Sequence, residues 1–205
     1  MSYRVASFGG DAVAFDDGTS VLLAGPSNPT DDHLYNMLAA GADEGDVAIV
    51  VTTNRTADQV VSALERRGAS GAERLGVVDV ASDDGESVDG ARVRRLGSPG
   101  DLTGLSVEFA KLLESFKESD GDVGRVRVGV SAVSTLLMYA EVRTVFRFLH
   151  VFTSRISSAD MLGGFTVTPG MHDDQTVNTV RTIFDCEARV TDDGLALSGT
   201  GYERE

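Results

Sequence analysis

The chain carries Ser131, Asp160 and His172 in the order in which α/β-hydrolases carry their nucleophile, acid and base. Ser131 is the centre of the segment GVSAV (129–133), which continues an apolar run. A nucleophilic serine needs a tight turn at this place, written G-x-S-x-G, and Val133 replaces the second glycine of that pattern. A β-branched side chain is crowded in such a turn. Serine hydrolysis at Ser131 is therefore kept as an alternative function.

A second polar segment follows the apolar run 20–25, where a strand is expected to give way to a helix. Asp31 and Asp32 offer adjacent carboxylates, which are the ligands that divalent cations prefer, but a metal site would need further carboxylates nearby. Alternatively, Thr30 caps the helix with its hydroxyl, and both aspartates complement the positive helix N-terminus. We expect this structural role and no metal. The candidate binding segment consists of Gly25, Pro26, Ser27, Asn28, Pro29, Thr30, Asp31 and Asp32.

Apolar runs and amphipathic stretches alternate along the chain and predict the elements that position these residues. Short apolar runs bounded by turn residues predict strands at 3–8, 12–15, 20–25, 47–53, 75–80, 125–130 and 164–168, and a closing hairpin of 188–190 with 195–197. Apolar residues at helical spacing predict helices at 31–40, 56–67, 102–117, 142–156 and 173–184, and 82–90 is expected to be an exposed loop. The alternation predicts one α/β domain over 1–205, with a mostly parallel sheet covered on both faces.

Composition limits the possible partners. The chain has 205 residues and a net charge of −14, from 18 Lys plus Arg against 32 Asp plus Glu. Only two of the basic residues are lysines, and this acidic, lysine-poor composition suggests adaptation to high salt. Its field repels nucleic acid, so no nucleic-acid partner is expected. The single cysteine, Cys186, excludes an intramolecular disulfide. No apolar run reaches the ~18 residues of a membrane span, and a cytoplasmic location is expected.

Several segments of the sequence resemble one ATPase family. VLLAGP (21–26) precedes a predicted helix and AIVVTT (48–53) follows it; further matching segments are VSTLLMY (133–139), FRFLH (146–150) and HDDQTVNT (172–179). The chain thereby resembles the KaiC/RadA branch of the RecA-like P-loop ATPases, in particular haloarchaeal KaiC-like proteins, over most of its length. The resemblance implies a RecA-like three-layer sandwich. It also implies a site for ATP with Mg²⁺ at 25–32 and some form of self-association.

The phosphate-binding segment departs from the family pattern G-x-x-x-x-G-K-[ST] at its critical positions. Thr30 replaces the second glycine, Asp31 the phosphate-binding lysine and Asp32 the magnesium-binding Ser/Thr. Two unit charges ~4 Å apart at an effective dielectric of ~20 interact by about 4 kcal/mol, so aspartate in place of lysine turns an attraction into a repulsion of similar size. The helix dipole returns only about 0.3–2 kcal/mol. No meaningful ATPase activity is expected.

The positions that bind the metal and prepare the attacking water in this family have changed as well. Ser131 stands where the Walker B aspartate belongs, and Asn54 and Arg55 stand where KaiC-like proteins carry a glutamate pair. The preferred interpretation is a nonenzymatic pseudo-ATPase without catalytic residues or cofactor, which acts as a regulatory or scaffolding protein through protein contacts. The first alternative is a divergent nucleotide-binding protein with ATP and Mg²⁺ and weak or partner-dependent ATPase activity.

The helix predicted at 142–156 carries more large apolar residues than one core-facing stripe needs. Phe148 and Val151 widen its apolar face beyond half of the circumference, and Arg143 and Arg147 lie on the remaining face. Deep burial within the domain would explain this pattern. Alternatively, the helix flanks a protein partner or another subunit, and these four residues are then interface candidates. The apolar face itself consists of Val142, Val145, Phe146, Leu149, Phe152 and Ile156.

Overall fold

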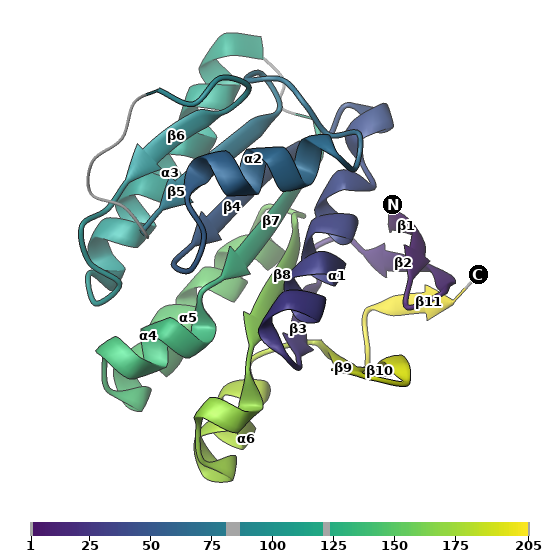
Figure 1. Cartoon of the computed structure of the whole chain (residues 1–205), viewed down its shortest axis with the longest axis vertical. Coiled ribbons are helices and arrows are strands. Elements are labelled where there is room, and N and C mark those ends of the chain that lie inside the picture. The colour runs from purple at the N-terminus through teal and green to yellow at the C-terminus, as the bar shows by residue number, and fades with distance from the viewer. Residues whose placement is uncertain (1, 81–86, 121–123, 205) are drawn as a thin grey trace.

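A computed structural model describes residues 2–80, 87–120 and 124–204 of the chain. Within these ranges an eight-stranded sheet lies between two layers of helices (Figure 1). Its strand order is β10-β9-β3-β8-β7-β4-β5-β6, and all neighbours pair in parallel except β9 and β10. The mostly parallel sheet and the C-terminal hairpin are therefore confirmed. The strands are β3 (Ser20–Ala24), β4 (Val47–Thr52), β5 (Leu75–Asp79), β6 (Arg92–Arg95), β7 (Val126–Ser131), β8 (Leu162–Val167), β9 (Cys186–Thr191) and β10 (Gly194–Gly199).

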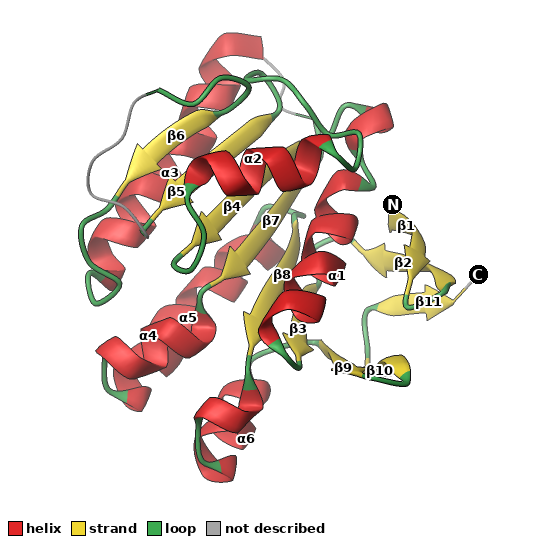
Figure 2. Cartoon of the chain, in the orientation of Figure 1, coloured by secondary structure: helices red, strands yellow, loops and turns green. Residues whose placement is uncertain are grey.

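Two hydrophobic cores form, one on each face of this sheet, because the central parallel strands are apolar on both sides. Helices α1 (Ser27–Ala39) and α2 (Ala57–Glu65) cover one face. The other face is covered by α3 (Leu102–Asp120), α4 (Val133–Tyr139), α5 (Val142–Ser158) and α6 (Asp174–Arg181) (Figure 2). Every helix in the described ranges is too short or too polar to pass through a lipid bilayer.

A small antiparallel sheet brings the two ends of the chain together (Figure 1). It consists of β1 (Ser2–Phe8), β2 (Asp11–Asp16) and β11 (Tyr202–Arg204), with β2 in the middle. Tyr3, Phe8 and Phe15 are fully buried and extend the core on the α1 side. The two expected N-terminal strands are confirmed, whereas the pairing of Tyr202 with Phe15 by β11 was not predicted.

The structure differs from the sequence-based expectations in several further elements. Helix α1 begins at Ser27, one turn earlier than the predicted start at 31, and the short helices η1 (Ala42–Glu44) and α4 were not predicted. Strand β6 was missed because its sequence RVRR has a single apolar residue and therefore no strand-like alternation. Most of the loop expected at 82–90 lies outside the described residues, which resume at 87.

A buried ion pair at the amino ends of the central strands was also not predicted. Arg127 points from β7 into the core and is fully buried. Its Nε donates to Oδ2 of Asp46 at 2.7 Å, and its Nη1 donates to the carbonyl oxygens of Met37 at 3.0 Å and Arg4 at 3.3 Å. The pair thereby ties α1, β1 and β7 to the segment before β4.

Candidate functional site

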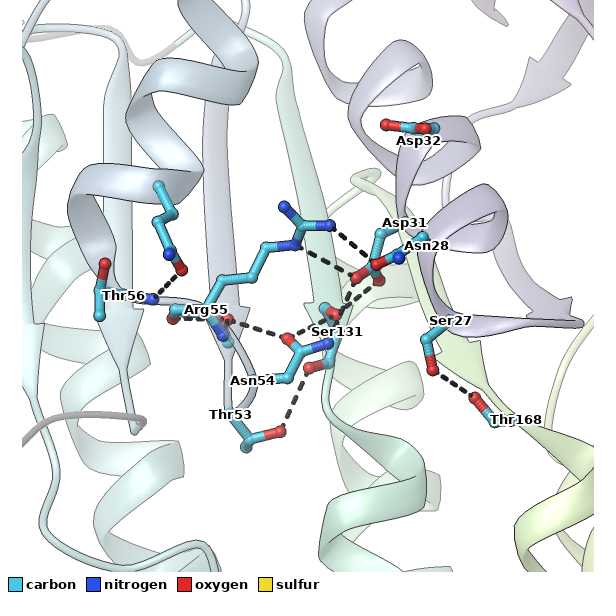
Figure 3. A network of polar contacts seen from close by, with 12 residues as sticks. Ser27, Asn28, Asp31, Asp32, Thr53, Asn54, Arg55, Thr56, Ser131 and Thr168 are labelled. Atoms are coloured by element: carbon cyan, nitrogen blue, oxygen red, sulfur yellow. Dashed lines mark hydrogen bonds and ion pairs between the residues drawn. The ribbon is translucent and has the colours of Figure 1, made fainter.

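The candidate site lies where three strands of the main sheet end and α1 begins (Figure 3). Strand β3 leads into α1, β4 ends just before Asn54, and β7 ends at Ser131. Strand β8 separates β3 from β7 in the sheet, and α1 crosses over β8 to contact β7 as well. This crossing brings the first turns of α1 against the ends of β4 and β7, the usual place for a ligand in an open α/β sheet.

The segment after Gly25 is a helical turn. Pro26 is the N-cap, the helix begins at Ser27, and the backbone N–H of Thr30 donates to the carbonyl of Pro26 at 3.0 Å. Pro29 is tolerated because a residue in the first turn needs no intrahelical donor. The prediction that Thr30 caps the helix is therefore wrong, and so is the placement of acidic residues in its first turn. Residues 27–30 thus form the first turn of the helix, at the place where a phosphate-binding loop would curve around a ligand.

Asp31 is the buried centre of the site, with 1% of its surface exposed. The hydroxyl of Ser131 donates to Oδ1 of Asp31 at 2.7 Å, and Nδ2 of Asn54 donates to Oδ2 at 3.2 Å. Nε of Arg55 lies 3.5 Å from the same Oδ2 (Figure 3). The residue at the family's lysine position thus contacts the residues at the Walker B and glutamate positions directly.

Asp32 does not take part in this network. Its side chain is directed away from Asp31 (Figure 3) and pairs with Nη2 of Arg67 on the segment after α2, at 2.7 Å. Arg67 also donates to Oδ1 of Asn36 at 2.7 Å and to the carbonyl of Ala63 at 2.8 Å. Asp32 therefore joins α1 to α2. Of the two adjacent aspartates only Asp31 faces the site, so they do not form a common metal-binding pair.

The segment after β4 holds its shape through its own hydrogen bonds. The hydroxyl of Thr52 donates to the carbonyl of Arg55 at 3.0 Å and accepts from the Arg55 backbone N–H at 3.1 Å. Nη2 of Arg55 donates to Oδ1 of Asn28 at 3.3 Å. Thr53 Oγ1 donates to the carbonyl of Ser131 at 3.3 Å. These contacts direct Asn54 and Arg55 towards Asp31. The sequence analysis identified both residues, but sequence spacing gave no signal for the hydrogen bonds that orient them.

A cavity of about 140 Å³ adjoins this network. It is lined mainly by hydroxyl side chains, and Thr30 Oγ1 is buried there without a hydrogen-bond partner among the described residues. Ligand pockets usually measure about 300–1,000 Å³. A larger cavity, of about 330 Å³, lies beside Tyr3 and Arg125 and shares no residue with the site. The lining residues of the smaller cavity include Ser27, Asp31, Asn54, Ser131, Ser134, Thr135, Thr166, Thr168 and Met171.

The residues of the hydrolase alternative are not assembled. Asp160 lies before the start of β8, where Leu162 pairs with Arg127, whereas Ser131 lies at the far end of β7. Tyr3 Oη donates to the carbonyls of both Asp160 and Val126. Asp160 therefore lies at the level of Val126, five strand residues or roughly 17 Å from Ser131 at about 3.3 Å per residue. In the described ranges Ser131 has no hydrogen bond to a histidine. Burial raises the pKa of the only thiol, Cys186, to about 12, so this group is not a nucleophile either.

The four interface candidates on α5 differ in their surroundings. Phe148 is half-buried and packs against Phe152, with ring centroids 5.5 Å apart. Val151 is 57% exposed, and Arg143 and Arg147 are exposed as well. Four residues of the expected apolar face are buried, namely Val145, Leu149, Phe152 and Ile156. Phe148 thus borders the core, while the other three candidates face outwards.

Comparison with known proteins places the chain in a family. The profile described as "Family of unknown function (DUF7504)" matches residues 18–190, which include all the residues of the Asp31 network. The chain belongs to this family. No curated protein matches the sequence.

Solved structures identify the fold of this DUF7504 member. The KaiC-like protein PH0186 from Pyrococcus horikoshii aligns with a TM-score of 0.63 at 13% identity, covering 100% of this chain and 92% of the other. The uncharacterised protein PH0321 from the same organism, solved in complex with an unknown peptide, aligns with a TM-score of 0.63 at 14% identity, covering 92% of each chain. At this identity the likeness concerns the fold alone, which is KaiC-like and RecA-type.

Proposed function

We propose that this chain is a nonenzymatic KaiC-like pseudo-ATPase that acts as a regulatory or scaffolding protein through contacts with other proteins. The observation that carries this proposal is the buried carboxylate of Asp31, at the position of the phosphate-binding lysine, 2.7 Å from the hydroxyl of Ser131. The ionic and polar partners of Asp31 come from the chain itself. Because Asp31 and Arg55 already contact each other, the site has no unpaired charge left for a nucleotide and its metal.

Electrostatics supports the proposal. A triphosphate bound at the start of α1 would meet the Asp31 carboxylate, and at an effective dielectric of ~20 each pair of like charges ~4 Å apart costs about 4 kcal/mol. The helix N-terminus offsets about 0.3–2 kcal/mol of this repulsion. The adjacent cation, Arg55, already lies 3.5 Å from Asp31 and donates to Asn28. Binding phosphate would require Arg55 to give up both contacts.

One observation favours the alternative of a divergent nucleotide-binding protein with weak or partner-dependent ATPase activity. The side chain of Arg55 is 29% exposed and lies next to the Asp31 network. A rotation of its guanidinium would present it to a phosphate near the cavity. The protein solved with a peptide, PH0321, favours the first proposal instead, because it links this fold to protein contacts.

Isothermal titration with Mg-ATP tests the proposal. At about 5 mM nucleotide, in low and in high salt, we expect no binding heat beyond dilution, because phosphate binding would be repelled at either ionic strength. Asp31→Lys restores the family's residue and separates the causes. If the helical turn itself excludes phosphate, this variant does not bind either. Micromolar affinity of the unchanged protein would contradict the proposal and support the divergent nucleotide-binding alternative.

A further inference from the structure

Most of the large apolar side chains that are exposed lie in one helix layer of the molecule. None of those in the described residues belongs to α1, α2 or the small sheet. Four of them lie on α3, α4 and α5, in the layer that covers the opposite face of the main sheet (Figure 1), and the fifth lies on η2 (Pro169–Met171). Met138 and Tyr139 at the end of α4 are 63% and 61% exposed, and Val151 on α5 is 57% exposed. The remaining two are Val107 and Met171.

Helix α5 also carries a net positive charge on an acidic chain. Its 17 residues include Arg143, Arg147 and Arg155 and no aspartate or glutamate. Because these three arginines contribute +3 to a net charge of −14, the rest of the chain carries −17. A cationic helix on such a molecule is locally distinct from the surface around it.

The arginines at the start of α5 have no partner among the residues that the structure describes. In the described ranges, no hydrogen bond or ion pair joins Arg143 or Arg147 to another residue, whereas Arg67, Arg125 and Arg181 all pair with carboxylates. Arg143, Arg147 and Val151 are spaced by four residues and therefore form one exposed stripe along the helix. Together with Met138 and Tyr139 on the adjoining end of α4, this stripe is called the α5 face below.

We propose that the α5 face docks an acidic amphipathic segment of a partner protein. Arginine, tyrosine and methionine are the residues that interface cores favour, and the unpaired cations complement carboxylates on the partner. The stripe from Arg143 to Val151 covers about two helical turns, or about 12 Å, along which a partner helix can lie. Nucleic acid fits less well, because a duplex extends beyond the stripe over the acidic remainder of the surface. A two-fold contact between copies would bring two cationic stripes together, which their like charges disfavour.

A peptide of defined charge tests this docking site. The probe is a fluorescein-labelled helical peptide of about 18 residues, with glutamate on one face and leucine on the other, and its match carries lysine in place of glutamate. In fluorescence anisotropy the full chain is expected to bind the acidic peptide saturably and the basic one not at all. Arg143→Glu combined with Arg147→Glu should weaken binding by about tenfold or more, because both cations become repulsive.

A charge-matched control separates the α5 face from a general charge effect. Arg66→Glu combined with Arg94→Glu changes two exposed arginines on other elements and should leave the affinity unchanged, with circular dichroism confirming that both variants fold. Equal binding of both peptides, or no effect of the α5 changes, would overturn the proposal. Competition by duplex DNA, or a dimer in sedimentation that the α5 changes disperse, would assign the face to another occupant. The proposal rests on the proposed role in protein contacts, but nucleotide binding alone would not refute it.

Discussion

Two buried carboxylates, at opposite ends of the central strands of the main sheet, are bonded by different kinds of partner. Asp46, before β4, faces the fully buried Arg127 at 2.7 Å, and this arginine is fixed by two backbone carbonyls. Asp31, near the end of β7, relies on the neutral Ser131 and Asn54 and on Arg55, which lies 3.5 Å away and is 29% exposed. A cavity adjoins each carboxylate, of about 150 Å³ at Asp46 and about 140 Å³ at Asp31, so the contrast lies in their partners.

Under the proposed function, the difference separates a structural charge pair from a candidate ligand site. Both side chains of the Asp46 pair are buried, with 0% of Arg127 and 3% of Asp46 exposed, and removing one partner would leave an isolated charge in the core. The Asp31 network is open on one side and is built from residues at positions that, in the family it resembles, hold phosphate, metal and water. We infer that the Asp46 pair maintains the fold, whereas the Asp31 network shapes the candidate site.

The largest effect is expected from Arg127→Met. This change keeps much of the side-chain volume but leaves Asp46 buried without its cation, and it should lower the free energy of unfolding by about 3–5 kcal/mol. Denaturant unfolding followed by circular dichroism measures this loss. Arg66→Met, on an exposed arginine, is the matched control and should stay within about 0.5 kcal/mol of the unchanged protein. A loss below about 1 kcal/mol for Arg127→Met would remove the contrast between the two carboxylates.

A smaller loss is expected from Asp31→Asn. The substitution preserves the shape of the side chain but removes the charge that Arg55 and Ser131 contact, and hydrogen bonds to a charged group contribute about 1.5–3 kcal/mol. Denaturant unfolding again gives the comparison, with Asp193→Asn in the exposed β9–β10 turn as the control. A more stable Asp31→Asn variant would contradict the account, because a destabilising carboxylate retained there indicates a group held for ligand chemistry.

The smallest effect concerns His33, which follows the two aspartates on α1. Burial lowers its pKa below the usual value of 6.5, and the Asp32 carboxylate opposes part of this shift. The unfolded chain therefore takes up a proton at a higher pH than the folded one. The stability that His33 contributes is complete above pH 6.5 and is lost as the pH falls from there towards the folded-state pKa.

Unfolding midpoints at pH 7.5 and pH 5.5 measure this effect when the unchanged protein is compared with His33→Gln. The variant should lose less stability on acidification than the unchanged protein, because it has no imidazole to protonate. An identical loss in both proteins would mean that His33 remains as accessible to protons in the folded state as in the unfolded chain, and that this end of α1 is not tightly packed.

The sequence predicted the architecture well because the parallel strands leave a plain signal. VAIVVT in β4 and the apolar run in β3 are buried on both faces, so their composition alone identifies them. The start of α1 was misjudged because Pro26 and Pro29 resemble a loop, although proline is well tolerated at a helix start. Strand β6 was missed because arginines make up most of it.

The site could be predicted only as a set of positions. Departures from the family pattern identified Asp31, Ser131, Asn54 and Arg55, and the structure brings these four together. That Asp31 turns inwards and Asp32 outwards follows from the earlier start of the helix, which no local pattern revealed. Arg127 and Asp46 are 81 residues apart, so their pairing depends on the fold.

A crystal structure of the chain grown with Mg-ATP at about 5 mM tests the central claim most directly. The account predicts that residues from Ser27 to Thr30 remain helical, that the Ser131 hydroxyl stays bonded to Asp31, and that no phosphate density appears beside them. An unwound first turn with phosphate groups seated next to Asp31 would contradict it.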